Sequence, residues 1–211
     1  MAAHIALLGD SIFDNGAYTN GLPDVVTHLR QILPEGMTAS LLAVDGSATA
    51  DLESQVANLP SDVSHVVVSV GGNDAILHAD ALNLPVKSTA DALRLFGERA
   101  LTFESSYRSA LASIVRRVPN ATVCTIYNAN LAGDDSVLAR VGLMLFNDVI
   151  LRTAVEWHLH VIDLRFVCVE PSDYANPLEP SSQGAAKIAK AIGAALGVAT
   201  ESQPATMVFA G

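Results

Sequence analysis

A serine that directly follows an apolar run is the first residue whose type and position could support chemistry. Residues 3–9 are apolar and stop at Gly9-Asp10-Ser11, so the Ser11 hydroxyl is expected at the carboxyl end of a buried strand. A hydroxyl placed there can act as a nucleophile, and the Ser11 N–H can help bind the oxyanion that its attack creates. From this segment alone, Asp10 or Ser11 as a simple helix cap is the plainer interpretation.

Small and polar residues also follow other apolar runs. Asp45-Gly46-Ser47 follows residues 37–44, and Gly71-Gly72-Asn73-Asp74 follows residues 65–70. In an open parallel sheet, ligands bind beyond the carboxyl ends of the strands, where such residues gather. The sequence therefore predicts a functional site at that edge of a sheet.

The elements that must position these residues alternate along the chain. Continuous apolar runs alternate with helical periodicity, which is typical of a parallel sheet covered on both faces. We predict one α/β domain over residues 1–200, a three-layer sandwich with a mainly parallel five-stranded sheet, followed by a tail over residues 201–211. The expected strands are 3–9, 37–44, 65–70, 121–127 and 160–164, and the expected helices are 23–33, 50–59, 90–118 (with a break near Gly97), 136–157 and 182–196.

Composition excludes several classes of function. The 211 residues carry 22 acidic and 12 basic side chains, a formal net charge of −10, which disfavours nucleic acid and anionic membranes as partners. Half of the residues are hydrophobic and only 16% are charged, as in a folded globular protein. No apolar run is long enough to span a bilayer and the N-terminus lacks a basic signal region, so we expect a cytoplasmic protein.

Neither a cofactor nor a metal ion is expected. Cys124 and Cys168 have no zinc-like spacing, and small buried apolar side chains are their simplest interpretation, although a bridge between them stays open. Neither a GxGxxG turn after the first strand nor a P-loop is present. Asp10 and Asp14 do not have the spacing of a phosphatase DxD pair.

Taken in order, the strand-end motifs resemble the SGNH, or GDSL, hydrolase superfamily of serine esterases and lipases. Residues 9–16 (Gly-Asp-Ser-Ile-Phe-Asp-Asn-Gly) are similar to its first block, especially in the plant-type lipases, while Gly46 matches the second block and Asn73 the third. The resemblance implies a flavodoxin-like sandwich and an acyl-enzyme formed on Ser11. It also implies an oxyanion held by the N–H groups of Ser11 and Gly46 and the amide of Asn73, where losing one donor typically costs about 2.7–4 kcal/mol.

The last block departs from the family pattern. It usually reads Asp-x-x-His-Pro-Ser, whereas the matching stretch here is Asn176-Pro177-Leu178-Glu179-Pro180-Ser181. Asn176 stands at the acid position and Glu179 at the position of the histidine. A Ser-His-Asp triad therefore cannot be carried over to this chain.

Three explanations for this departure remain open. Glu179 could serve as the base, with an ordinary pKa of about 4.3 against about 6.5 for histidine, lowered by the following helix and raised by burial. His78, the only histidine beyond the carboxyl end of a strand, could serve instead. The protein could also be a catalytically impaired module that binds a ligand or partner in an esterase-like crevice.

We favour a serine carboxylic ester hydrolase that uses Ser11, Gly46, Asn73 and Glu179. Its expected partner is a small-molecule ester with a small or short acyl group. The apolar residues 75–86, expected as a loop, lie where an acyl chain would fit and could hold a medium one.

Overall fold

Five parallel strands form one sheet in the order β2-β1-β3-β4-β5 in the computed structural model, which describes residues 3–198. The strand order is that of flavodoxin-like sheets. The strands are β1 (Ala3–Gly9), β2 (Met37–Leu41), β3 (His65–Ser69), β4 (Ala121–Cys124) and β5 (His160–Ile162). The predicted fold class is therefore confirmed, while the predicted tail over residues 201–211 lies outside the described residues.

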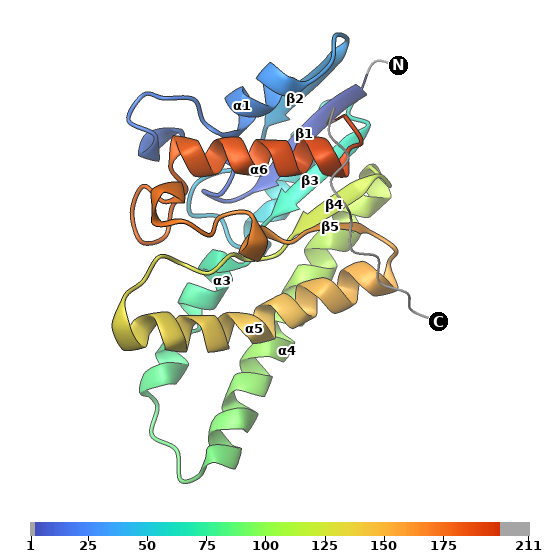
Figure 1. The fold of residues 1–211 in the computed structure, drawn as a ribbon. Coiled ribbons are helices and arrows are strands. Elements are labelled where there is room, and N and C mark those ends of the chain that lie inside the picture. The colour runs from blue at the N-terminus through green and yellow to red at the C-terminus, as the bar shows by residue number, and fades with distance from the viewer. Residues whose placement is uncertain (1–2, 199–211) are drawn as a thin grey trace.

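Six α-helices in the described part of the chain cover both faces of the sheet (Figure 1). They are α1 (Val25–Ile32), α2 (Leu52–Ala57), α3 (Gly72–Leu77), α4 (Thr89–Arg117), α5 (Gly133–Glu156) and α6 (Ser182–Ala195). None of these helices is long and apolar enough to cross a membrane.

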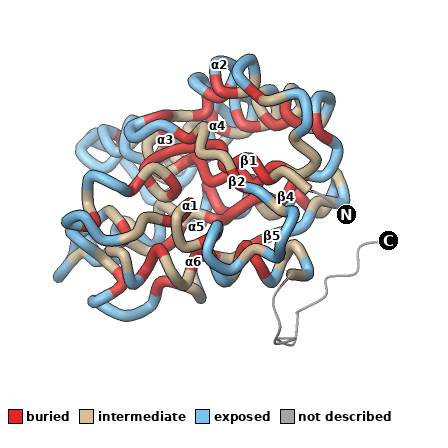
Figure 2. Tube along the Cα trace, turned by 90° about the horizontal axis from the view of Figure 1, so that it is seen from above, coloured by how far each residue is buried: buried red, intermediate tan, exposed pale blue. Residues whose placement is uncertain are grey.

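Alternate residues of β1 divide the core into two clusters. Ile5 and Leu7 pack with buried residues of α1 and α6, while Ala6 and Leu8 pack with those of α2, α4 and α5. This alternation is the period-two pattern of a strand buried on both faces. Figure 2 shows the result, with the strands mostly buried in the middle and exposed segments around them.

Several predictions about the elements were wrong in detail. The helix expected to break near Gly97 continues without interruption through α4. Residues 42–44 still bond to β1, but the chain bends there because the N–H groups of Leu42 and Ala43 both donate to the Leu7 carbonyl. The segment 75–86, expected as a loop, begins within α3 and continues into the 3-10 helix η3 (Ala79–Asn83).

Helices α4 and α5 cross on one face of the sheet and are joined by charged side chains. The Glu104 carboxylate of α4 accepts a hydrogen bond from Arg152 of α5 at 3.0 Å and one from Arg108 at 2.8 Å. This network fixes α5 against α4, and the first turns of α5 lie near α3 at the carboxyl edge of the sheet (Figure 1).

Candidate active site

Ser11 lies on a sharp turn that only glycine permits at its start. Gly9 ends β1 with a φ of +128°, and a Cβ at this position would lie 1.7 Å from the Ser69 carbonyl oxygen. The next N–H, that of Asp10, donates to this Ser69 oxygen, and the N–H groups of Phe13 and Asp14 then fold back onto the Asp10 carbonyl. Among residues 3–198, no hydrogen bond engages the Ser11 N–H, so it is free to bind an oxyanion.

Gly46 lies on the loop after β2, and its N–H also has no hydrogen-bond partner in the part of the chain that the structure describes. Its φ of +81° belongs to the left-handed region that favours glycine. Two contacts tie this loop to the segment after Ser11: the Asp45 N–H donates to Asp14 at 2.9 Å, and the Tyr18 hydroxyl donates to Asp45 at 2.6 Å. Gly46 is exposed and does not line the cavity at Ser11, so the structure does not bring it together with Ser11, Asn73 and Glu179 in that cavity.

Asn73 is held by the same loop. Its side-chain Nδ2 donates one hydrogen bond to the Ser47 carbonyl at 2.9 Å, which leaves the second N–H of the amide for a ligand. The next residue, Asp74, accepts from the N–H of Thr49 at 3.1 Å and from its hydroxyl at 2.6 Å. These hydrogen bonds connect the start of α3 to the loop that contains Gly46, and they orient the Asn73 amide.

Glu179, in the segment before α6, lines a cavity together with Ser11 and Asn73. Burial raises the pKa of its carboxyl group and the charge of Asp45 raises it further, while the nearby Ser11 hydroxyl opposes the rise. Its Oε2 atom is buried without a hydrogen-bond partner. A half-buried carboxylate beside a serine hydroxyl, with a free oxygen, is chemically able to accept the serine proton.

The Glu179 segment is held from both sides. Asn176, at the family's acid position, accepts from the N–H groups of Leu178 and Glu179 at 2.8 and 2.9 Å. On the other side, the fully buried Asn15 donates to the Pro180 carbonyl at 3.1 Å and accepts from the Val25 N–H at 3.1 Å. Asn15 was not singled out from the sequence, because its partner Pro180 lies 165 positions away in the chain.

Asp10 is the other residue that the sequence did not single out as part of the site. It is buried, and its Oδ1 accepts from the Ile12 N–H at 3.1 Å. Burial, together with the charges of Glu179 and Asp74, raises the pKa of Asp10 to about 8. At neutral pH the protonated form therefore predominates, which spares the site a second negative charge beside Glu179.

Ser11, Asn73 and Glu179 line one cavity of about 360 Å³, and most of the other lining side chains are apolar. His78 lines it too, with its ring against Phe146 at a centroid distance of 6.1 Å. No hydrogen bond in residues 3–198 joins His78 to Ser11. Within the same residues, no group of three or more His, Cys, Asp or Glu side chains is placed to hold a metal ion, and Cys124 and Cys168 are buried and unpaired.

Solved structures with a similar fold include several ester hydrolases. Phospholipase A1 from Streptomyces albidoflavus is 17% identical, with a TM-score of 0.68 over 92% of this chain and 99% of that one. An extracellular lipase from Streptomyces rimosus is 17% identical, with a TM-score of 0.61 over 92% of this chain and 100% of that one. The W215I variant of Axe2, an acetyl xylan esterase from Geobacillus stearothermophilus, is 18% identical, with a TM-score of 0.66 over 93% of this chain and 95% of that one. Because these sequence identities are low, the similarity shows a shared fold and no more.

No curated protein sequence matches the chain. A family model does match, that of the GDSL-like lipase/acylhydrolase family, and it covers residues 7–187, which include Ser11, Gly46, Asn73 and Glu179. This match spans most of the chain and agrees with the sheet order and the strand-end motifs. The chain therefore belongs to the GDSL-like lipase/acylhydrolase family and is a carboxylic ester hydrolase.

Proposed function

We propose that the protein hydrolyses small carboxylic esters through an acyl-enzyme on Ser11, with Glu179 as the general base. The observation that carries this proposal is the half-buried Glu179 carboxylate, which lines the same cavity as Ser11 and has a buried oxygen, Oε2, without a hydrogen-bond partner. It occupies the place of the histidine that the family pattern has in the last block.

The proposed reaction has two halves. Glu179 takes the Ser11 proton while the serine oxygen attacks the ester carbonyl carbon. The Ser11 N–H and the Asn73 amide hold the oxyanion, and the Gly46 N–H would join them once its loop closes over a bound ester. Glu179 then returns the proton to the departing alcohol. Water enters, gives one proton to Glu179 and attacks the acyl carbon. Glu179 then returns this proton to the Ser11 oxygen as the acid departs, which restores both side chains.

A carboxylate can replace the histidine because its two oxygens are equivalent. A catalytic histidine needs a partner that fixes which nitrogen carries the proton, whereas a carboxylate has no such tautomer. Asn176 is therefore not needed to orient the base, and its side chain instead accepts hydrogen bonds from the backbone N–H groups of Leu178 and Glu179. The burial that raises the Glu179 pKa also makes it a stronger base than an exposed glutamate.

Hydrolysis of p-nitrophenyl acetate and butyrate from pH 4.5 to 9 tests this proposal. We expect Ser11→Ala to reduce the rate to the uncatalysed background and Glu179→Gln to lower kcat by about 10²–10⁴-fold. Wild-type activity should fall as the pH drops through the raised pKa of Glu179, and the residual activity of Glu179→Gln should lack this acid limb.

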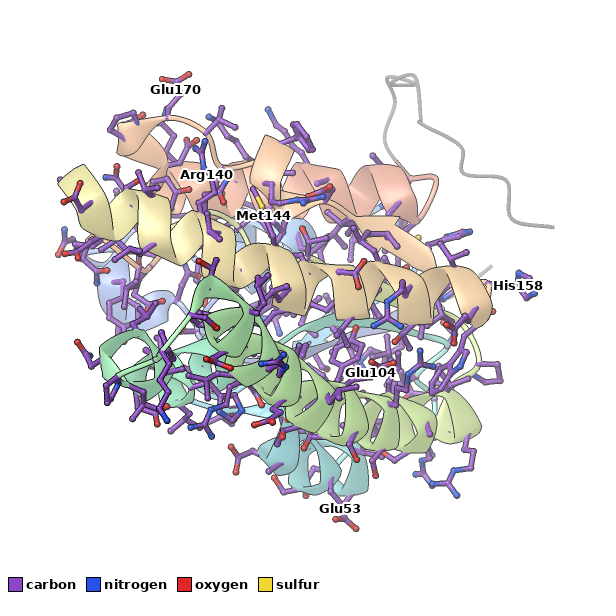
Figure 3. All side chains as sticks on the ribbon, turned by 90° about the horizontal axis from the view of Figure 1, so that it is seen from below. Glu53, Glu104, Arg140, Met144, His158 and Glu170 are labelled. Carbon is purple, nitrogen blue, oxygen red and sulfur yellow. The ribbon has the colours of Figure 1, made fainter. Side chains whose placement is uncertain are left out.

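Two variants serve as matched controls. Ser106→Ala removes an exposed hydroxyl on α4, and Glu53→Gln neutralises an exposed carboxylate on α2, which points away from the molecule in Figure 3. Both should retain wild-type rates. Equal rates in Ser11→Ala and wild type would instead favour a ligand-binding module, and an acid limb that persists in Glu179→Gln but disappears in His78→Asn would assign the base to His78.

A further inference from the structure

We propose that the cavity beside Ser11 holds the acyl chain of a medium-length ester, such as an octanoyl ester, and that Gly142 of α5 makes the room for it. This inference rests on the proposed function of Ser11 and names the substrate class for that site. Of the short and medium acyl groups that the sequence allowed, it selects the medium one.

The cavity has one polar end and a long apolar side. Ser11, Asn73 and Glu179 form the polar end, and the apolar side comes from α3, η3, the first half of α4 and the first half of α5. Its volume of about 360 Å³ lies near the lower end of the range for small-molecule sites, about 300–1,000 Å³, and exceeds what an acetyl group would need.

Several apolar side chains of the lining are exposed to solvent. Ile76 and Leu138 are 54% and 48% exposed, although both line it. Apolar surface of this kind is unfavourable in water, and an acyl chain that covers it gains hydrophobic free energy. The exposure thus indicates an apolar ligand.

Gly142 lies in the middle of the face that α5 turns to the cavity. The lining residues of α5 recur at spacings of three and four, as one helical face requires, from Asp135 through Leu138 to Phe146. Met144, which is 54% exposed and absent from the lining, lies on the other side of α5 (Figure 3). A Cβ added at Gly142 would meet no atom within 4 Å, so the missing side chain leaves open space inside the cavity.

The charges of the lining favour an uncharged chain. Within residues 3–198, the lining has one Lys or Arg side chain, Arg99, whose Nη2 pairs with Asp80 at 3.0 Å while its Nε has no hydrogen-bond partner. Asp135 and Glu179 supply acidic groups, and burial favours the protonated form of Asp10. A carboxylate on the acyl chain would have to share Arg99 with Asp80 and would meet repulsion from Asp135 and Glu179.

The proposed chemistry places the acyl chain, rather than the alcohol, on the apolar side. Glu179 must return its proton to the alcohol oxygen, so the alcohol departs beside Glu179. Asn73, at the start of α3, holds the carbonyl oxygen, and the apolar lining continues from α3. The acyl chain is bonded to this carbonyl, so it is the part of the ester that can lie along the apolar lining.

Substitution of Gly142 by leucine tests this assignment. In wild type, kcat/KM for p-nitrophenyl esters should rise from acetate to octanoate, by at most about fourfold per methylene. Gly142→Leu should lower the octanoate-to-acetate ratio by at least about tenfold. Gly97→Leu is the matched control, since Gly97 is also a helical glycine with no atom within 4 Å of an added Cβ but does not line the cavity, and it should keep the wild-type ratio.

A second series separates the acyl side from the alcohol side. Acetate esters of ethanol and octanol should differ less than the acyl series does, and Gly142→Leu should leave their ratio unchanged. Two results would overturn the inference in an enzyme whose activity depends on Ser11. One is a kcat/KM that stays constant or falls from acetate to octanoate. The other is a Gly142→Leu variant that changes only the ratio for the two alcohols.

Binding without turnover keeps this test independent of the proposed mechanism. Calorimetry with methyl octanoate and methyl acetate should show that Ser11→Ala binds the octanoate more tightly, and that adding Gly142→Leu, but not Gly97→Leu, weakens it. Equal binding of the two esters would overturn the inference. If the protein binds methyl octanoate but does not hydrolyse esters in a way that depends on Ser11, only the catalytic proposal fails.

Discussion

At the scale of single residues, the candidate site contains two carboxyl groups that differ in their surroundings, the half-buried Glu179 and the buried Asp10. Glu179 lines the same cavity as Ser11, and its buried Oε2 atom has no hydrogen-bond partner, which suits a base. Asp10 is fully enclosed, and burial raises its pKa to about 8. The sequence allowed Glu179 to be predicted because it replaces a residue of a recognisable block, whereas the protonation of Asp10 follows from burial, which no local pattern reveals.

The raised pKa of Asp10 predicts how the stability of the fold depends on pH. Between about pH 4 and pH 8 the unfolded chain has lost the Asp10 proton while the folded chain still holds it, so rising pH favours unfolding. This contribution to stability is fully present below the ordinary pKa of 3.8 and is lost by about pH 8, at a slope of at most about 1.4 kcal/mol per pH unit.

Asp10→Asn removes this titration and should change the pH dependence accordingly. Relative to wild type, the variant's free energy of unfolding should increase from pH 5 to pH 8, as measured by urea unfolding followed by circular dichroism. Asp134→Asn, at an exposed carboxylate in the first turn of α5, serves as the control and should give the wild-type trend. Parallel curves for Asp10→Asn and wild type would show that Asp10 is ionised in the fold.

At the scale of elements, the strands and long helices could be predicted, but their ends and the short helix α3 could not. The periodicity of residues 90–118 is strong enough to predict a helix, and α4 follows it closely. The strand predicted over 121–127 stops at Cys124, because the Ile126 N–H and carbonyl both bond to the Asn147 side chain of α5. Such endings depend on tertiary partners, which sequence periodicity does not contain.

The contact between Asn15 and Pro180 predicts a positioning role for Asn15. Asn15→Ala would leave the Pro180 carbonyl and the Val25 N–H buried without partners, at about 1–3 kcal/mol each, and should lower the free energy of unfolding by about 2–6 kcal/mol. Since Pro180 follows Glu179, we also expect kcat to fall with little change in KM.

Asn58→Ala is the matched control, since its side chain makes one exposed hydrogen bond to the Ser54 carbonyl. It should change both the stability and kcat only slightly. Assays are run at a temperature where Asn15→Ala remains folded by circular dichroism. A normal kcat under those conditions would show that Asn15 only stabilises the fold.

At the scale of the whole molecule, the sheet order explains why distant motifs meet. Ser11, Asn73 and Glu179 come from the start, the middle and the end of the chain, and all lie beyond the carboxyl edge of the sheet around β1 and β3. The site edge could be predicted because parallel strands place all their carboxyl ends together. The size of the cavity could not, since it depends on how α3, α4 and α5 pack.

The central claim, that Glu179 activates Ser11, is tested most directly by covalent labelling. Diisopropyl fluorophosphate reacts with activated serines, and mass spectrometry of the digested protein locates the added group. We predict labelling of the peptide that contains Ser11 alone, at a rate lowered by about 10²–10⁴-fold in Glu179→Gln and unchanged in Glu53→Gln. Labelling of another residue, or an equal rate at Ser11 in Glu179→Gln and wild type, would contradict the claim.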